Sequence, residues 1–441
     1  MIYKPRKHQS EAMEFFRKNP YIGTFLWHEM GLGKSLSSLW LAREHLANLR
    51  KKGVMAPKFI IILPKSAVPT WKVECHKQTP DIYKDMIVYP YSQLSKATNM
   101  LRYVDVRMII FDESHYLKSP ETDRAKVLCN FLVALGTQGG RFEHGKLIML
   151  TGTPMPNSAA ELYTTWALCS TTNIVDSAER VLDLKRFENW KKLYTNKKTK
   201  TWKKKYGREQ SGSSYEGVAN EDKLMEVMKP LTHYRRSEDC IDLPDKEEIH
   251  INLGLDDDAL LKDANIEEPE AYMALLERLS RAKTPYLLNW VADFLTTGSS
   301  QLVVFSNYVE PLRNLRDKHP KDVVLITGAE SGGERAVNLK KFQDGKVRVI
   351  AMSFRAGSES LNLQNAHISL YHGWFWHDAG IKQAMARTRR SGQTKRTLHY
   401  FLTSGENDSR LLSMIRRKEE ATSTVEALML SNSKLGLDSF I

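Results

Sequence analysis

The residues with the clearest chemical potential lie near the N-terminus, in the run Met30-Gly31-Leu32-Gly33-Lys34-Ser35. This run follows an apolar stretch, Tyr21 to Trp27, and opens a stretch with helical character. A glycine-rich loop between a strand and a helix presents backbone N–H groups, a helix N-terminus and one ammonium group to a polyphosphate. The Ser35 hydroxyl can bind the accompanying magnesium ion. The segment therefore predicts a phosphate-binding loop for ATP or GTP.

Two adjacent carboxylates, Asp112 and Glu113, follow the apolar run Met108 to Phe111. An isolated Asp-Glu pair is usually a solvated acidic turn, but a preceding strand and an upstream phosphate loop favour a catalytic role. We expect the two side chains to point to opposite sides of an extended chain. Asp112 would then hold Mg²⁺ while Glu113 polarises the attacking water.

These residues must be positioned by a sheet, and the chain shows the required alternation of strand-like and helix-like segments. In the first half the strand-like runs are Phe59 to Leu63, Met86 to Tyr89, Met108 to Phe111 and Leu147 to Leu150. Such alternation predicts a parallel sheet covered by helices on both faces. Because ligands bind beyond the carboxyl ends of parallel strands, the residues after each run are candidates, including Pro64, Lys65 and Thr151. A further helix is expected from Arg6 to Lys18, where Gln9 could read an adenine edge with its amide.

The second half repeats the pattern. Its strand candidates are Leu302 to Phe305, Val323 to Ile326, Val347 to Met352, Ile368 to Tyr371 and Tyr400 to Leu402. If the segment around Gln383, Arg387 and Arg390 is helical, their spacing of i, i+4 and i+7 places them on one face. An isolated arginine-rich helix is more often plain surface charge. Between the halves, His233 to Arg236 indicates a basic helix end and Leu243-Pro244 a boundary.

Length and composition describe a globular protein with two core domains, since 441 residues exceed one ordinary domain. We expect an N-terminal domain over residues 1–240, with a basic helical insertion at about 160–230. A C-terminal domain would cover 241–441, with a helical segment at about 255–295. The net charge of +13 favours a polyanionic partner. The four widely spaced cysteines suggest neither a zinc site nor disulfides, and no signal peptide or 18-residue apolar run occurs, so a cytoplasmic location is expected.

The most basic stretch is Lys185 to Arg208, with eleven Lys or Arg residues and a single acid, Glu188. Phe187, Trp190, Tyr194, Trp202 and Tyr206 are interleaved with the lysines. A charge run is usually a solvated face. Lysines spaced among aromatic rings favour contact with a nucleic-acid backbone and stacking on exposed bases, so both interpretations stay open.

Four motifs, in this order, resemble those of superfamily 2 helicases, specifically the Swi/Snf-type ATPases. They are His28-Glu29-Met30-Gly31-Leu32-Gly33-Lys34-Ser35, Leu63-Pro64-Lys65-Ser66 with Trp71-Lys72-Val73-Glu74, Asp112-Glu113-Ser114-His115, and Leu150-Thr151-Gly152-Thr153-Pro154. Further on, Ser353 to Leu363 resembles the family motif that faces nucleotide and DNA backbone, and Gln383 to Gln393 resembles its arginine-finger motif. The resemblance extends from about Arg6 to about Glu420.

The resemblance implies an α/β fold of two RecA-like doubly wound parallel-sheet lobes with helical insertions, and a cofactor, ATP with Mg²⁺, bound between the lobes. The implied catalytic residues are Lys34, Asp112, Glu113, Gln383, Arg387 and Arg390, with Ser35 and Asp112 on magnesium. The implied cofactor-binding residues are Arg6, Gln9, Met30, Gly31, Leu32, Gly33, Lys34 and Ser35. DNA contacts are expected at Pro64, Lys65, Trp71, Ser92, Thr151, Lys191, Lys192, Lys197, Lys198, Trp202, Lys203, Ser353, Asn362 and Trp376.

The sequence departs from the family pattern at three positions. His28 stands where the Swi/Snf type usually has an acid, and Ser358 and Ser360 replace glycines. The two serines restrict the backbone of their loop. None of the three changes removes a catalytic group.

We therefore expect a DNA-dependent ATPase, monomeric and with little base specificity, that translocates on duplex or branched DNA and remodels it. The segment Tyr206 to Lys246 is most similar to the fork-remodelling, strand-annealing subgroup, and compact proteins of this kind occur in bacteriophages, which suggests a phage source. One alternative is a duplex translocase without strand separation that displaces bound proteins or serves a separate nuclease. The other is a non-catalytic nucleic-acid clamp.

Overall fold

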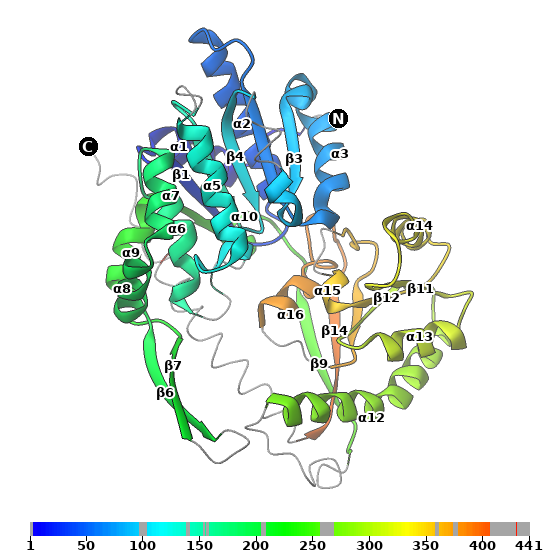
Figure 1. Ribbon diagram of the computed structural model, residues 1–441. Helices are drawn as coiled ribbons and strands as arrows, with labels where there is room; N and C mark the ends of the chain where they lie inside the picture. Colours follow the sequence, from blue (N-terminus) through cyan, green and yellow to red (C-terminus); the bar gives the residue numbers. More distant parts are fainter. Residues whose placement is uncertain are drawn as a thin grey trace. The chain divides into compact units, whose positions relative to one another are not determined.

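The computed structural model describes residues 3–96, 104–137, 142–152, 155, 158–203, 209–255, 269–357, 361–373, 378–405 and 429. The chain divides into two compact units (Figure 1). The first comprises Met1–Cys240 and Lys418–Ile441, of which Met429 is described, and the second comprises Ile241–Arg417. Each unit is described by itself.

Unit 1 is built on a six-stranded sheet in the order β3-β2-β4-β5-β1-β8, and all its neighbouring strands are parallel. Its strands are β1 (Gly23–His28), β2 (Lys58–Leu63), β3 (Met86–Pro90), β4 (Val106–Asp112), β5 (Lys146–Leu150) and β8 (Thr232–Arg235). The central strands are continuous apolar runs because both faces of the sheet are covered. The four strand-like runs predicted in this half are confirmed, and the apolar stretch Tyr21 to Trp27 before the loop also forms a strand, with ends that differ by one or two residues.

Helices cover both faces of this sheet and create two separate hydrophobic cores. One core contains side chains of α1 (Lys7–Lys18), α2 (Lys34–Lys51) and α3 (Val68–Gln78). The other contains side chains of α5 (Asp123–Thr137), α6 (Tyr163–Cys169), α7 (Ile174–Leu182), α8 (Leu184–Tyr194) and α9 (Glu221–Met228). The short helix α10 (Ser237–Cys240) ends the unit, and single 3-10 turns lie at Lys65–Ala67, Pro80–Asp85, Tyr91–Gln93, Ser114–Leu117, Ala159–Leu162 and Lys229–Leu231.

The basic insertion is not purely helical. Asn173 and Asp183 cap α7 and α8 by accepting hydrogen bonds from the first backbone N–H groups of each helix. After α8 the chain forms an antiparallel hairpin, β6 (Asn196–Lys203) and β7 (Glu209–Glu216), in which Asn196 lies opposite Glu216 (Figure 1). Sequence reasoning did not predict this hairpin.

The segment from His233 to Arg236 is not a helix end, and that prediction is wrong. Residues Thr232–Arg235 form β8, which pairs in parallel with β1 at the edge of the sheet, so that His28 lies opposite Arg235. Lys229–Leu231 forms the turn before it, and α10 begins at Ser237.

Unit 2 repeats the architecture with a second six-stranded parallel sheet in the order β11-β12-β10-β13-β14-β9. The strands are β9 (Lys246–Asn252), β10 (Leu302–Ser306), β11 (Val323–Ile326), β12 (Val349–Ser353), β13 (Ile368–Tyr371) and β14 (Thr397–Thr403). The helices are α12 (Pro269–Thr296), α13 (Val309–Lys318), α14 (Gly332–Gln343), α15 (Phe354–Gly357) and α16 (Asp378–Met385). The strand expected from Val347 begins at Val349, β9 was not predicted, and α12 supplies the expected helical segment from residue 269 onward.

Two hydrophobic cores, one on each face of this sheet, also hold unit 2 together. Helix α14 begins with a capping box in which Ser331 and Glu334 each accept a hydrogen bond from the other's backbone N–H. The α/β class with two parallel-sheet units is thus confirmed. Among the described residues, no helix is both long enough and apolar enough to span a membrane.

Candidate functional site

The phosphate loop lies between the last residue of β1 and the first turn of α2. Every residue of β1 is buried, so the strand fixes the point from which the loop starts. Gly31 and Gly33 adopt φ values of 83° and 73°, which glycine takes without strain. A Cβ atom at Gly33 would also lie 2.7 Å from the amide nitrogen of Gln9. These two glycines are therefore required by backbone conformation and, at Gly33, by close packing.

The ammonium group of Lys34 is held by the backbone that enters the loop. Lys34 Nζ donates hydrogen bonds to the carbonyl oxygens of His28, at 2.6 Å, and of Glu29, at 3.2 Å. A Cβ atom at Gly152 would lie 3.3 Å from the same nitrogen. The residues that follow β5 therefore lie directly beside the phosphate loop.

Helix α1 contacts the loop from the other side through Gln9 and His8, both of which are buried. The Gln9 amide donates to the carbonyls of Leu32, at 3.3 Å, and Gly33, at 3.4 Å, and its oxygen accepts from the Arg6 N–H. The His8 ring also contacts the Leu32 carbonyl, at 3.0 Å. In this structure the amide supports the loop, and its contact with adenine stays a prediction.

The carboxylate of Asp112 is buried at the end of β4 and held by two donors. Trp71 Nε1 donates to Oδ2 at 2.7 Å, and the Glu113 N–H donates to Oδ1 at 3.1 Å. Burial, followed by the adjacent charge of Glu113, raises the pKa of Asp112 to about 6. Since Asp112 lies opposite Leu150, which lies opposite Leu26, the acidic pair is two strands away from the phosphate loop.

The chain is not extended at Glu113, and that expectation is wrong. Glu113 has a φ of 50°, in the left-handed region, and begins the 3-10 turn Ser114–Leu117. Its carboxylate lies 3.4 Å from His115 Nδ1, which lies 3.3 Å from the Thr151 hydroxyl. Burial lowers the pKa of His115 to about 4, so the ring is neutral at pH 7 and joins the ends of β4 and β5.

The oxygen donors that the sequence assigns to magnesium fit the chemistry of that ion. Ser35 offers a hydroxyl and Asp112 a buried carboxylate, whose charged form a nearby cation would favour. The described part of the chain holds no group of three or more His, Cys, Asp or Glu side chains arranged to bind a metal. Mg²⁺ takes one or two protein oxygens and completes its shell with phosphates and water, so Ser35 and Asp112 are a sufficient set of protein ligands for it.

Some of the residues of unit 1 that were expected to contact DNA are exposed, and others are buried. Lys65 and Ser92 are exposed and Pro64 is half-buried, each just beyond a strand end. Thr151 and Trp71 are each 2% exposed, and their polar atoms contact His115 and Asp112. In this structure Trp71 and Thr151 therefore support the acidic motif.

Three of the five aromatic residues of the basic segment lie in its described part and do not offer stacking surfaces. Phe187, Trp190 and Tyr194 are buried in the core of unit 1, and Trp190 Nε1 donates to the Ala159 carbonyl at 2.8 Å. For these three residues the stacking interpretation is wrong. Tyr206 and the side chains of Trp202 and Lys203 lie outside the described part of the structure.

The lysines of the segment differ in their surroundings. The Lys191 ammonium pairs with Glu188 and lies 4.6 Å from the centre of the Phe187 ring. The Lys198 ammonium nitrogen lies 3.0 Å from Glu216 Oε2, so these two side chains also form an ion pair. Lys192 and Lys197 are exposed.

The motif residues of unit 2 lie beyond the ends of its strands. Ser353 is the last residue of β12, and Asn362 is exposed before β13. Gln383 lies on α16, which ends at Met385, so Arg387 and Arg390 lie beyond the helix and the prediction of one continuous helical face is wrong. Arg387 is 8% exposed, and Arg390 Nη1 donates to the Leu361 carbonyl at 3.1 Å. Trp376, Ser358, Ser360, Thr153 and Pro154 lie outside the described residues.

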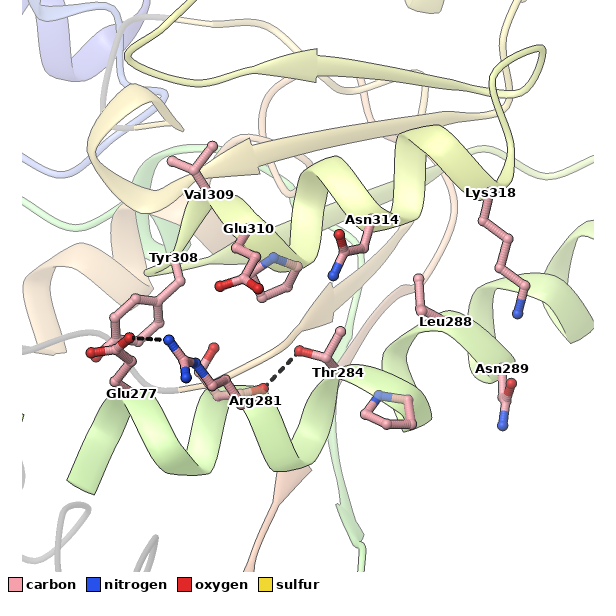
Figure 2. A pocket seen from close by; sticks show the side chains of 13 residues that line it. Glu277, Arg281, Thr284, Leu288, Asn289, Tyr308, Val309, Glu310, Asn314 and Lys318 are labelled. Carbon is pink, nitrogen blue, oxygen red and sulfur yellow. Dashed lines mark hydrogen bonds and ion pairs between the residues drawn. The ribbon is translucent and has the colours of Figure 1, made fainter. Parts of the chain in front are cut away.

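Unit 2 also has a groove of about 620 Å³ between α12 and α13, shown in Figure 2. Polar side chains from both helices line it, including Glu277, Arg281 and Lys318, and the Glu277 and Arg281 side chains form an ion pair across one turn. None of the motif residues lines this groove, so it is separate from the candidate site.

Two successive parallel α/β units, the first carrying a phosphate loop and an acidic pair on nearby strand ends, have the architecture expected of a nucleotide-binding core of the helicase type. Comparison with protein-family models agrees. The SNF2-related domain matches residues 8–88 and 83–261, and the helicase conserved C-terminal domain matches residues 283–392. The chain belongs to the SNF2-related family.

Individual relatives are more distant. The chain is 26% identical over 427 residues to the SWI/SNF-related matrix-associated actin-dependent regulator of chromatin subfamily A-like protein 1 of Xenopus laevis, covering 88% of this chain and 41% of that protein. It is 24% identical over 437 residues to the mouse DNA annealing helicase and endonuclease ZRANB3, covering 89% and 38%. The chain thus spans about two-fifths of the length of these relatives. The Sulfolobus solfataricus SWI2/SNF2 ATPase core, solved with double-stranded DNA, matches with 21% identity and a TM-score of 0.40 over 97% of this chain and 95% of that chain.

Proposed function

We propose that this chain is an ATP-dependent DNA motor that translocates on duplex or branched DNA and remodels forks and junctions. The placement of Lys34, Gly152 and Asp112 at the ends of three adjacent strands carries the proposal, since it brings an ammonium group and a buried carboxylate to one edge of the sheet. The finer assignment to branched DNA rests on the two relatives, one of which is named a DNA annealing helicase.

The proposed mechanism assigns each group of unit 1 a role. Lys34 leaves the His28 and Glu29 carbonyls and binds the β- and γ-phosphates of ATP. Ser35 and Asp112 would hold Mg²⁺, and the ion would supply positive charge beside the phosphates. Trp71 keeps the Asp112 carboxylate oriented by donating to Oδ2.

Glu113 is the proposed general base for the attacking water. Its backbone is in the left-handed region just beyond β4, and neutral His115 contacts its carboxylate. Arg387 and Arg390 of unit 2 are proposed to stabilise charge on the transferred phosphoryl group, and Gln383 to assist them, because planar guanidinium groups suit that transition state. These assignments, the monomeric state and the phage source stay predictions.

Binding to DNA is proposed to rest on phosphate contacts without sequence preference. Lys65 and Ser92 beyond β2 and β3, and Lys192 and Lys197 of the basic insertion, are exposed and available for such contacts. Ser353 and Asn362 are proposed to act in the same way from unit 2.

The deciding experiment is steady-state ATP hydrolysis with and without DNA, for the parent protein and for Glu113→Gln. We expect DNA to stimulate the parent, and the variant to lose about 100-fold or more, the usual effect of removing a general base. Glu121→Gln, an exposed glutamate on the following loop, is the matched control and should keep full activity. Absence of DNA-stimulated hydrolysis in the parent, or full hydrolysis in Glu113→Gln, would end the motor hypothesis.

The preferred DNA structure is decided by a second measurement. It compares stimulation of ATP hydrolysis by single-stranded, duplex, forked and four-way DNA, and strand release from the duplex, forked and four-way substrates, under the same conditions. Remodelling of branched DNA predicts release from forked and four-way substrates that depends on ATP. Stimulated hydrolysis without any strand release would instead assign the chain as a duplex translocase.

A further inference from the structure

The chain that leaves unit 1 is bonded to the entrance of the phosphate loop. β8 is the last strand of unit 1, and the connector, residues 236–241, runs from it through α10 to the first residue of unit 2. β8 pairs with β1, the strand that leads into the loop. The phosphate loop and the connector therefore start from adjacent strand ends.

Bonding between the two segments continues beyond the end of the sheet. The Glu29 N–H donates to the Arg235 carbonyl at 3.0 Å. The Ser237 N–H then donates to the Glu29 carboxylate at 2.8 Å, and the Ser237 hydroxyl donates to the Met30 carbonyl at 2.9 Å. Two consecutive residues of the loop entrance are thus held by the start of the connector.

The strand residues behind this junction are held by a buried histidine pair. His28 Nε2 and His233 Nδ1 are 2.7 Å apart, and the His8 ring lies 5.9 Å from the His28 ring. Burial lowers the pKa of both paired rings, and His28 is surrounded by Lys34, Arg235 and His8, so the pair is neutral. It fixes the last residue of β1 against β8 without adding charge beside the phosphate site.

The lysine of the loop is bonded to the same short segment. Lys34 Nζ donates to the carbonyls of His28 and Glu29, and Glu29 in turn holds Ser237. A polyphosphate offers the ammonium a stronger, charge-assisted bond than a carbonyl does. If a bound nucleotide draws Lys34 to its phosphates, the bonding of Glu29, the residue that contacts the connector, would therefore change.

We propose that Glu29 and Ser237 are positioning residues, through which nucleotide binding at the phosphate loop changes the conformation of the connector. The inference rests on the proposed function, because it takes a nucleoside triphosphate as the ligand that draws Lys34 from the two carbonyls. When Lys34 leaves, the His28–Met30 segment shifts, and the Ser237 bonds to Glu29 and Met30 carry the shift into residues 237–241.

The test is hydrogen–deuterium exchange of the full chain, with and without a non-hydrolysable ATP analogue and Mg²⁺. In the parent protein, we expect the analogue to change exchange of the connector amides by about fivefold or more, roughly the factor that one neutral hydrogen bond is worth. In Ser237→Ala, which removes the bond to the Met30 carbonyl, and in Glu29→Gln, which removes the charged acceptor, this response should fall by about half or more. Affinity for the analogue, measured by calorimetry, should stay within about threefold because neither side chain is proposed to touch phosphate.

Two controls separate coupling from folding. Ser237→Thr keeps the hydroxyl and should retain the parent's response. Ser170→Ala removes a hydroxyl that contacts Arg180 elsewhere in unit 1 and should leave the connector response unchanged. Thermal unfolding of each variant identifies any that fails to fold. If either Ser237→Ala or Glu29→Gln fails to fold, the connector response of the other variant decides whether the coupling exists.

The outcomes distinguish this inference from the proposed function. If the parent binds the analogue but its connector amides do not respond, or if both variants respond fully, the coupling is refuted and the motor is untouched. If the parent neither binds nor hydrolyses ATP, the proposed function itself fails.

Discussion

The hydrogen bond from Trp71 to Asp112 gives a direct test of how the acidic motif is supported. Both side chains are buried, and the donor and acceptor atoms are 2.7 Å apart. Trp71→Phe keeps an aromatic ring in the same core and removes the only N–H of the indole. The Asp112 carboxylate is then deprived of a donor that it cannot replace with bulk water.

The size of the effect follows from the kind of bond. A hydrogen bond to a charged group contributes about 1.5–3 kcal/mol. If about 1.5–2 kcal/mol of this free energy serves to orient the carboxylate during hydrolysis, Trp71→Phe should lower the hydrolysis rate about 10- to 30-fold. We also expect a higher Mg²⁺ requirement, because Asp112 is less firmly held and its charged form is less stabilised.

The assay is DNA-stimulated ATP hydrolysis over a Mg²⁺ titration, with denaturant unfolding measured in parallel. Trp190→Phe is the matched control, since Trp190 is also buried and its indole donates to the Ala159 carbonyl at 2.8 Å. The control should lower stability by about 0.5–1.5 kcal/mol with no change in Mg²⁺ requirement. Equal effects of the two substitutions on hydrolysis would refute the reasoning and leave Trp71 as a core residue only.

Two further predictions concern charge. The double substitution Lys192→Ala and Lys197→Ala should weaken DNA binding and reduce the slope of log affinity against log salt concentration by about two units, one for each phosphate that is no longer neutralised. Substitution of the exposed pair Lys51 and Lys52 is the control and should leave the slope unchanged. An unchanged slope in the Lys192 and Lys197 variant would mean that these lysines face solvent and do not contact DNA. Burial lowers the pKa of His233 to about 3, so folding stability is retained above about pH 6.5 and falls below it, where the unfolded histidine gains a proton. In urea unfolding between pH 5 and 7.5, His233→Leu should reduce the pH dependence of the free energy of unfolding by up to about 1.4 kcal/mol per pH unit. The exposed control His144→Gln should leave this pH dependence unchanged. An unaltered pH dependence in His233→Leu would contradict a neutral histidine pair.

The first sheet could be predicted from sequence because its central strands are apolar runs that end in chemically distinctive residues. Phe59 to Leu63 and Met108 to Phe111 have no competing helical pattern of polar residues, and both are buried on two faces. The same reasoning placed Lys34 and Asp112 at one edge of the sheet. The strand order, with β5 between β1 and β4, required the structure, because adjacency is not encoded in any single segment.

In the basic insertion, the many lysines led to the incorrect prediction that its aromatic rings at Phe187, Trp190 and Tyr194 would be exposed. Phe187, Trp190 and Tyr194 follow a spacing of i, i+3 and i+7, which indicates one apolar helical face, and all three are in the core. That periodicity was available in the sequence. The lysines between them favoured a nucleic-acid interpretation, although a helix can bury its rings and expose its lysines at once.

The end of α16 was harder to foresee. Neither proline nor a helix-ending glycine separates Gln383 from Arg387, and the helix nevertheless ends at Met385. The Leu363 N–H donates to the Arg387 carbonyl at 3.2 Å, so a contact with the loop before β13 occupies a carbonyl just beyond the helix. Such a tertiary contact overrides local propensity and leaves no trace in the spacing of the arginines.

His28, the irregular residue of the phosphate loop, is explained by a residue 205 positions away. Sequence reasoning treated His28 as a feature of the loop because β8 was not recognised as a strand. In the structure, an acid at position 28 would be buried against the His233 ring, near Lys34 and Arg235, which would favour a charged pair in place of the neutral one. The residue at position 28 is therefore set jointly with the residue at position 233, and a substitution at either one alters how β8, and the connector that follows it, is held to the loop that binds phosphate.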